Sequence, residues 1–284
     1  MLNDSSAIFA FLIGTLAFLF WISRFEALRP LFRVLPPVIW AYFLPMFATT
    51  AGLLPSADPV YSWISRWMLP VSLFLLMVTI DLRAIMRLGR LAIIMMLAGT
   101  FGIIVGASIS YVTFASLLPP DAWKSMASLS GSWIGGTANM IAIQKSVGAP
   151  DSALGPVIVV DTVVGYGWMG VLLVLSGFHE RFDKWTQARS EVRAVIADLS
   201  RWSPAAAKAP SFEALGIILG LAFVAAGVAI WIGQQLPSVG DPSVISQTTW
   251  AVLVVVTAGL LLSFTPIRKI DQDGGQQIGY LALY

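Results

Sequence analysis

The feature that most constrains this chain is its series of long apolar runs. A helix needs about 20 apolar residues to cross the hydrocarbon core of a bilayer, because it rises only about 1.5 Å per residue. Only 11% of the residues are charged, against about a quarter in a typical soluble domain. In lipid, backbone polar groups must find their partners within helices or closed barrels. The sequence therefore predicts an all-α, polytopic transmembrane helical bundle that contacts the lipid bilayer.

The basic residues between these runs indicate which loops face the cytoplasm. Arg24, Arg29 and Arg33 follow the first run, whereas Asp4 precedes it. We therefore expect a multi-pass protein of the bacterial inner (plasma) membrane with its N-terminus outside. The expected spans are 7–22, 34–54, 67–80, 91–118, 153–177, 212–236 and 244–264, with an outer loop at 55–66.

Composition excludes several other classes of function. The chain has no cysteine and one histidine, His179, in a charged segment, so it offers no disulfide framework, thiolate metal site or histidine cluster. Its net charge of +2 gives no indication of nucleic-acid binding. It contains no His-Glu-x-x-His or Gly-x-Ser-x-Gly motif. We therefore expect no enzymatic activity, no resident metal and no cofactor beyond a coupling ion.

The stretch from Ser128 to Gln144 differs from the runs around it. It gathers small, hydroxyl and amide residues around Gly135 and Gly136. Each glycine costs about 1 kcal/mol relative to alanine inside a helix, and non-helical backbone at membrane depth survives only where protein covers it or where it lines a cavity. The pattern predicts a broken or re-entrant helix at 131–147. The alternative is a small-residue face for close helix packing.

Counting charges leads to the same segment. The basic loops at 83–90 and 178–210 both belong inside, yet three apolar segments separate them, so one of the three should not cross. If this is the glycine stretch, residues 1–177 make about five crossings and the next unit begins inside, as in inverted-repeat transporters. We expect a first membrane repeat at 1–177, a cytoplasmic amphipathic linker at 178–211 and an incomplete second repeat at 212–284. A solvated helical linker remains the alternative for the middle segment.

Asp161 is the one carboxylate far from any expected membrane boundary. A charge at the bilayer centre costs about 2.5–3.5 kcal/mol on insertion scales, so the default interpretation is a functional site. Asp161 would bind Na⁺, together with Asn139, or carry a proton. The alternatives are hydrogen bonds to neighbouring hydroxyls or a salt bridge to Lys145. The full candidate set for solute and ion binding is Ser130, Ser132, Gly135, Gly136, Thr137, Asn139, Gln144, Asp161 and Thr162.

Two other charged residues have structural interpretations. Asp81 lies where the third span meets a basic loop, and we expect it to pair with Arg83 or Arg87 or to cap the following helix. Lys145 is expected to extend toward the membrane interface, with a counter-charge for the solute as the alternative.

Three motifs carry a resemblance to a known family. They are Leu129-Ser-Gly-Ser-Trp-Ile-Gly-Gly-Thr-Ala-Asn139, Asp161-Thr-Val-Val-Gly165 and Thr79-Ile-Asp-Leu-Arg83. They resemble the domain of unknown function eight-hundred-and-nineteen family of bacterial integral membrane proteins. That family is similar to the cation–proton antiporter and anion transporter superfamily, which implies an inverted-repeat transporter. The resemblance also implies a longer chain with a second glycine-rich motif, so we expect this sequence to be C-terminally truncated.

Together these features predict a secondary transporter of a small, anionic solute coupled to Na⁺ or H⁺, with homo-oligomerisation left open. An uncoupled channel and a structural membrane protein are the alternatives.

Overall fold

The apolar runs fold into α-helices throughout the part of the chain that the structure describes. The structure is a computed structural model and describes residues 2, 4–34, 37–82, 86, 89–176, 178–186, 211–240, 245–271 and 273–284. Apart from an isolated bridge between Val239 and Ile245, these residues form no β-structure, which confirms the all-α class. The α-helices are α1 (Ser5–Ile22), α2 (Arg29–Val34), α3 (Pro37–Thr50), α4 (Pro59–Val78), α6 (Gly89–Phe114), α7 (Ala122–Gly135), α8 (Thr137–Ser146), α9 (Leu154–Ser176), α10 (His179–Thr186), α12 (Phe212–Gln235), α13 (Gln247–Leu262) and α14 (Gly275–Leu283). Short 3₁₀ turns are η1 (Glu26–Leu28), η2 (Ala115–Leu117), η3 (Asp151–Ala153) and η4 (Pro266–Asp271).

Several of these helices can cross a bilayer. Within the described residues, α1, α4, α12 and the segment Ile93–Leu117, which includes most of α6, are long and apolar enough to span a membrane. Helix α9 has 23 residues, and α13 is shorter, with 16. The chain is therefore a multi-pass membrane protein, as its sequence predicts.

Two expected boundaries were wrong. The second expected span, 34–54, contains α3, which has only 14 residues. The expected loop at 55–66 is helical from Pro59 onward, because Asp58 accepts a hydrogen bond from the Val60 backbone N–H at 2.9 Å. A capping aspartate followed by proline at the first helical position is a helix-start signal. The expected spans rested on hydropathy, which does not register this signal.

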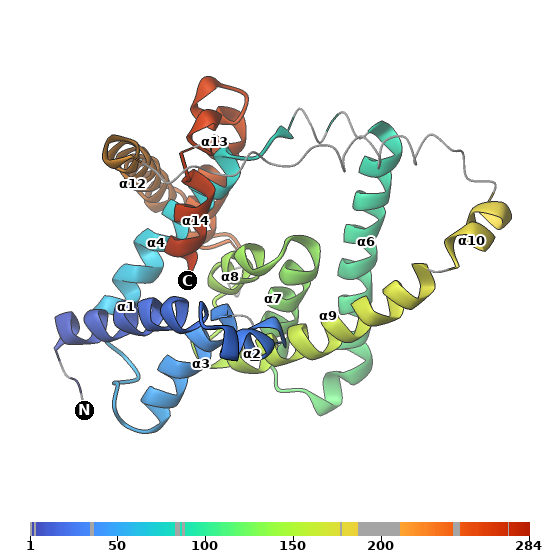
Figure 1. The fold of residues 1–284 in the computed structure, drawn as a ribbon, viewed down its shortest axis with the longest axis horizontal. Coiled ribbons are helices and arrows are strands. Elements are labelled where there is room, and N and C mark those ends of the chain that lie inside the picture. Colours follow the sequence, from blue (N-terminus) through green and yellow to red (C-terminus); the bar gives the residue numbers. More distant parts are fainter. Residues whose placement is uncertain are drawn as a thin grey trace.

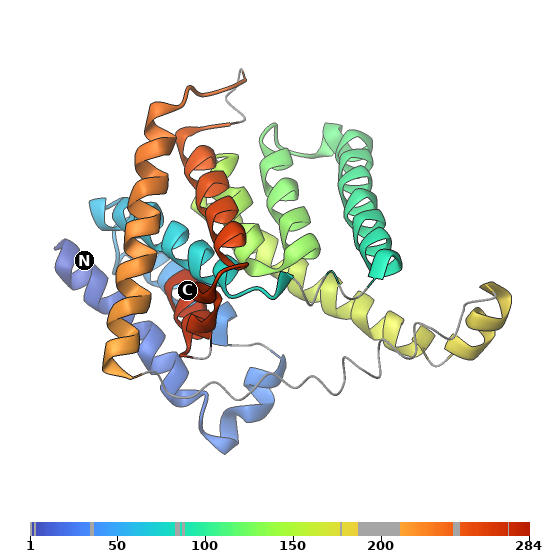
Figure 2. The same ribbon diagram turned by 90° about the horizontal axis from the view of Figure 1, so that it is seen from above.

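The main hydrophobic core surrounds the second half of α4. Phe74 and Leu75 are fully buried there, and α12, α13 and α14 pack around this segment (Figure 2). Helix α13 approaches α4 closely at Gly259, where a Cβ atom would lie 2.7 Å from Met77 Cβ. Beyond the core, Arg268 of η4 forms a 2.5 Å ion pair with Asp81. The expected partners of Asp81, Arg83 and Arg87, lie outside the described residues.

Helices α6 to α9 form a second group beside this core (Figures 1 and 2). Helix α6 packs against α7, and α7 also packs against α8 and α9. Helix α8 joins the two groups, because its Ile141 and Ala142 belong to the main core while its Met140 packs with Val157 and Ile158 of α9.

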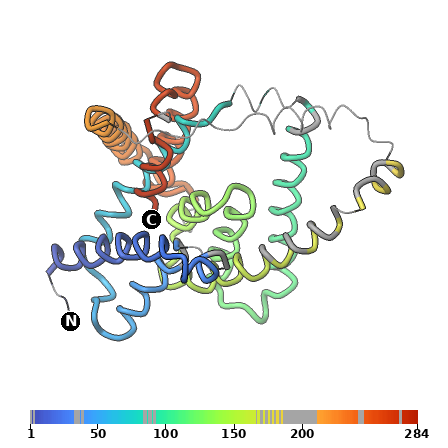
Figure 3. The backbone as a smooth tube through the Cα atoms, viewed as in Figure 1, coloured from blue at the N-terminus to red at the C-terminus, as the bar shows by residue number. Residues whose placement is uncertain are grey.

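The expected linker at 178–211 falls mostly outside the described residues. Its described part is α10, which follows α9 in the chain (Figure 3), together with residues 178 and 211. The expected amphipathic pattern over 187–210 therefore stays a prediction.

Candidate functional site

The expected helix break lies at Gly136. Helix α7 ends at Gly135 and α8 begins at Thr137, with Gly136 between them at φ +84° and ψ −173°. Glycine adopts a positive φ without the steric cost that a Cβ atom brings. The predicted break within 131–147 is therefore confirmed. Whether the two helices re-enter the membrane from one side stays a prediction.

The same stretch also packs tightly, as the alternative interpretation had it. Helices α7 and α8 form a hairpin in which a Cβ atom at Gly131 would lie 3.0 Å from the Asn139 carbonyl oxygen. A Cβ atom at Gly135 would overlap the Asn139 side-chain amide. Gly136 thus breaks the helix, whereas Gly131 and Gly135 allow α7 and α8 to pack closely.

The break removes several backbone groups from the helical pattern. The last bond of α7 runs from the Gly136 N–H to the Ser132 carbonyl at 2.6 Å, and the first bond of α8 runs from the Met140 N–H to the Gly136 carbonyl at 3.1 Å. The carbonyls of 133–135 and the amides of 137–139 therefore have no i to i−4 partner in either helix. Carbonyl oxygens suit a hard cation, and helix N-terminal amides suit an anion.

Asp161 lies beside the last turn of α7. The Ser132 hydroxyl Oγ donates a 3.0 Å hydrogen bond to Asp161 Oδ2, and both residues are partly buried. This bond joins α7 to α9. It matches the interpretation in which neighbouring hydroxyls hold the acid. The other alternative, a salt bridge to Lys145, is wrong, because Lys145 pairs with Asp151 instead.

The remaining candidates divide into three groups. Thr137 and Asn139 occupy the first turn of α8, partly buried beside the break. Ser130 donates to the Met126 carbonyl of its own helix at 2.8 Å, and Thr162 is partly buried next to Asp161. Gln144 lies near the opposite end of α8, so the structure does not place it with Asp161.

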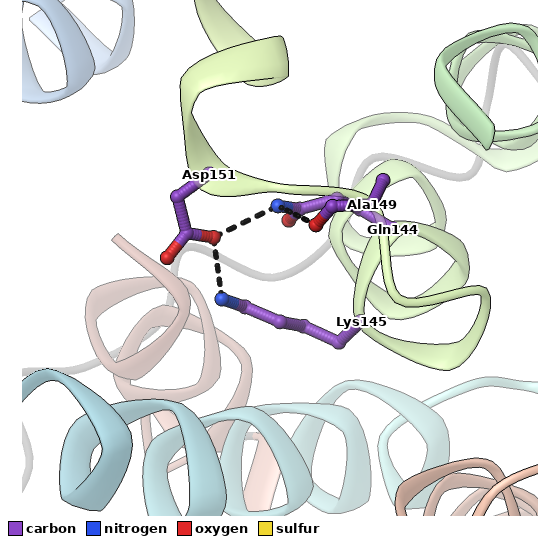
Figure 4. Close-up of polar contacts among 4 residues, drawn as sticks. All are labelled: Gln144, Lys145, Ala149 and Asp151. Carbon is purple, nitrogen blue, oxygen red and sulfur yellow. Dashed lines mark hydrogen bonds and ion pairs between the residues drawn. The ribbon is translucent and has the colours of Figure 1, made fainter. Parts of the chain in front are cut away.

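Gln144 belongs to a second polar cluster, which we call the α8 carboxylate cluster, made of Gln144, Lys145 and Asp151 (Figure 4). Asp151 Oδ1 accepts a 2.9 Å bond from Gln144 Nε2 and a 2.6 Å bond from Lys145 Nζ. Gln144 Nε2 also donates to the Ala149 carbonyl at 3.2 Å. Partial burial alone would raise the pKa of Asp151, but the hydrogen bond and charge of Lys145, with the Gln144 hydrogen bond, hold it below its ordinary value.

Sequence reasoning missed Asp151 as a partner and treated residues 148–151 only as a turn. The available signal was the return of an acid after Gly148 and Pro150, a turn that brings it back to the end of α8. It also missed Thr249 of α13, whose hydroxyl donates to the Ser146 carbonyl at 3.1 Å. No local signal in the sequence marks that contact.

No three His, Cys, Asp or Glu side chains lie together anywhere in the described ranges. A shallow apolar groove lies on α1 and α3. It shares no residue with the Ser132–Asp161 contact or with the α8 carboxylate cluster, since it is lined by Phe11, Gly14, Thr15, Phe18 and Leu44.

Comparisons with known proteins agree with the resemblance seen in the motifs. A family described as "Protein of unknown function (DUF819)" matches residues 10–284. The uncharacterized membrane protein YjcL of Bacillus subtilis (strain 168) is 22% identical over 249 residues, which cover 84% of this chain and 61% of YjcL. The chain thus spans less than two thirds of that relative. No solved structure matches.

Proposed function

This chain belongs to the DUF819 family of membrane proteins, and from that premise we propose that it is a secondary transporter of a small, anionic solute, coupled to Na⁺ or H⁺. The proposal includes an inverted-repeat architecture with a first repeat at 1–177 and part of a second at 212–284. It also includes a bacterial inner-membrane location with the N-terminus outside.

The observation that carries this proposal is the position of Asp161 beside the helix break at Gly136, where its hydrogen bond with Ser132 places it. A carboxylate inside a membrane helix is costly and marks ion or proton pathways in known membrane proteins. Transporters with inverted repeats bind ions and solutes where helices are interrupted near the midplane. Here the two lie together, because Ser132, in the last turn before the interruption, is bonded to Asp161, which is 29 residues further along the chain.

Each part of the site has a role in this proposal. Asp161 binds the coupling ion, with the Ser132 hydroxyl and the freed carbonyls near Gly135 as further oxygens. The N-terminus of α8, with Thr137 and Asn139 beside its free amides, faces the negative group of the solute. Gly136, with its positive φ, allows the turn between α7 and α8. Ser130 and Thr162 are the candidate hydroxyl residues near Ser132 and Asp161 in the sequence.

Proteoliposomes provide the test. The purified full chain is reconstituted into these vesicles, and an inward Na⁺ or pH gradient is imposed. The uptake of a panel of radiolabelled small carboxylates is then measured. Coupled transport accumulates a solute above its equilibrium level, and dissipating the gradient abolishes that accumulation. An uncoupled channel only equilibrates the solute, and a structural protein moves none. Either result would refute the proposal.

A further inference from the structure

The α8 carboxylate cluster has the chemistry of a site for a carboxylate. Lys145 supplies an ammonium and Gln144 supplies an amide N–H, and both donate to the same oxygen of Asp151, at 2.6 and 2.9 Å. Charge-assisted hydrogen bonds of this kind are what a protein uses to hold an anionic group. In this structure the anionic group belongs to the chain itself.

Gln144 has features that a simple surface ion pair does not need. Its side chain is only 1% exposed. Its Nε2 has two acceptors, Ala149 and Asp151, which fixes the orientation of the amide. Its oxygen Oε1 is buried and accepts no hydrogen bond within the described chain. A buried acceptor without a donor is costly, so this oxygen favours any ligand that brings a donor.

Among the described residues, the Asp151 side chain has bonds only to Gln144 and Lys145, which both lie on α8. Its side chain is 68% exposed, and it lies on the short turn η3 between α8 and α9 rather than inside a helix. A small movement of this turn would withdraw the carboxylate and leave Lys145 and Gln144 in place on α8.

We propose that Gln144 and Lys145 form a recognition site for the carboxylate of a small hydroxy or amino acid, which Asp151 occupies in the absence of solute. This inference deepens the proposed transport function and depends on it. The site is separate from the one proposed at the N-terminus of α8, so the solute carboxylate occupies the two at different times. The solute carboxylate replaces that of Asp151 on Lys145 Nζ and Gln144 Nε2. The hydroxyl or ammonium of the solute donates to Gln144 Oε1, the oxygen that has no partner. Asp151 is thus an internal competitor, and solute binding includes the cost of displacing it.

The test measures glycolate binding to the purified full chain by NMR titration with ¹³C-labelled ligand. Asp151→Asn removes the competing charge, so glycolate should bind about three-fold more tightly or better. Lys145→Gln removes a charge-assisted bond, so binding should weaken about ten-fold or more. Lys145→Arg keeps the charge and should retain most of the binding. Acetate, which lacks the hydroxyl, should bind more weakly than glycolate because it cannot reach Gln144 Oε1 with a donor.

The chain offers a matched control pair. Lys124 and Asp121 form a 3.2 Å ion pair with side-chain exposures of 23% and 72%, close to the 24% and 68% of Lys145 and Asp151. Asp121→Asn should therefore leave glycolate affinity unchanged.

A purely structural latch would give the opposite pattern. If folded Asp151→Asn protein binds glycolate no more tightly than the unsubstituted chain, or if Lys145→Gln binds it equally well, the inference is overturned. Failure of the unsubstituted chain and Asp151→Asn alike to bind glycolate also overturns it. None of these results changes the ion dependence expected at Asp161, so a failure here is distinguishable from a failure of the proposed function.

Discussion

Ser132 of α7 donates its hydroxyl hydrogen to the carboxylate of Asp161 on α9, at 3.0 Å. The two helices are thereby joined one turn before the break at Gly136. The Asp161 carboxylate, which would be costly in lipid, instead accepts a hydrogen bond from the polar stretch that forms α7 and α8.

Replacing Ser132 by alanine should change the affinity of the Asp161 site for its coupling ion by about ten-fold or more, because a hydrogen bond to a charged group contributes about 1.5–3 kcal/mol. The matched control is Ser130→Ala, since Ser130 donates only to the Met126 carbonyl of its own helix. Ion-dependent shifts in melting temperature measure the effect. Equal behaviour of the two variants would mean that the Ser132 bond has no role in ion binding.

The glycines of the hairpin should differ in their tolerance of alanine. Gly136→Ala forces a Cβ atom onto a backbone with φ +84° and ψ −173°, a region essentially restricted to glycine, and should cost about 1–3 kcal/mol. Gly135→Ala overlaps the Asn139 side chain and should cost about 1–3 kcal/mol through overpacking. In Gly106→Ala, by contrast, the new Cβ has no neighbour within 4 Å, so stability should hold or rise. Melting temperatures in detergent distinguish these cases, and equal losses at all three positions would contradict the hairpin geometry.

The ion pair between Asp81 and Arg268 should stabilise the junction of α4 and η4 only modestly. The two side chains are 23% and 38% exposed, and partly exposed pairs contribute about 0.2–1 kcal/mol. A double-mutant cycle with Asp81→Asn and Arg268→Gln isolates the pair from the other contacts of each residue. A coupling energy near zero would show that the contact contributes nothing to stability.

Acid should weaken the α8 carboxylate cluster. The pKa of Asp151 is lowered in the folded chain from its ordinary value of 3.8, so the unfolded chain takes up a proton first as the pH falls. The stabilisation is therefore complete well above pH 3.8 and is lost as the pH falls through the lowered value. Melting curves from pH 6 to 3 should show a smaller loss for Asp151→Asn than for the unsubstituted chain. A parallel decline in both would contradict this.

The sequence predicted those parts of the structure that depend on local physics. Apolar runs require helices in lipid, and the Gly135-Gly136 pair indicated a break, so both could be expected from the local sequence. The start of α4 was missed because hydropathy ignored the cap formed by Asp58. The contacts of Asp151 with Gln144 and of Thr249 with Ser146 could not be expected. They depend on how turns and distant helices meet, and mostly apolar helices carry little sequence information about which face meets which neighbour.

We propose that Asp161, beside the broken helix, binds the coupling ion. Its most direct test compares the unsubstituted chain with Asp161→Asn and the control Asp121→Asn, measuring melting temperature over a series of Na⁺ concentrations and pH values. Na⁺ or pH should shift the melting temperature of the unsubstituted chain and of Asp121→Asn, and Asp161→Asn should lose this response. An undiminished response in folded Asp161→Asn protein would contradict it.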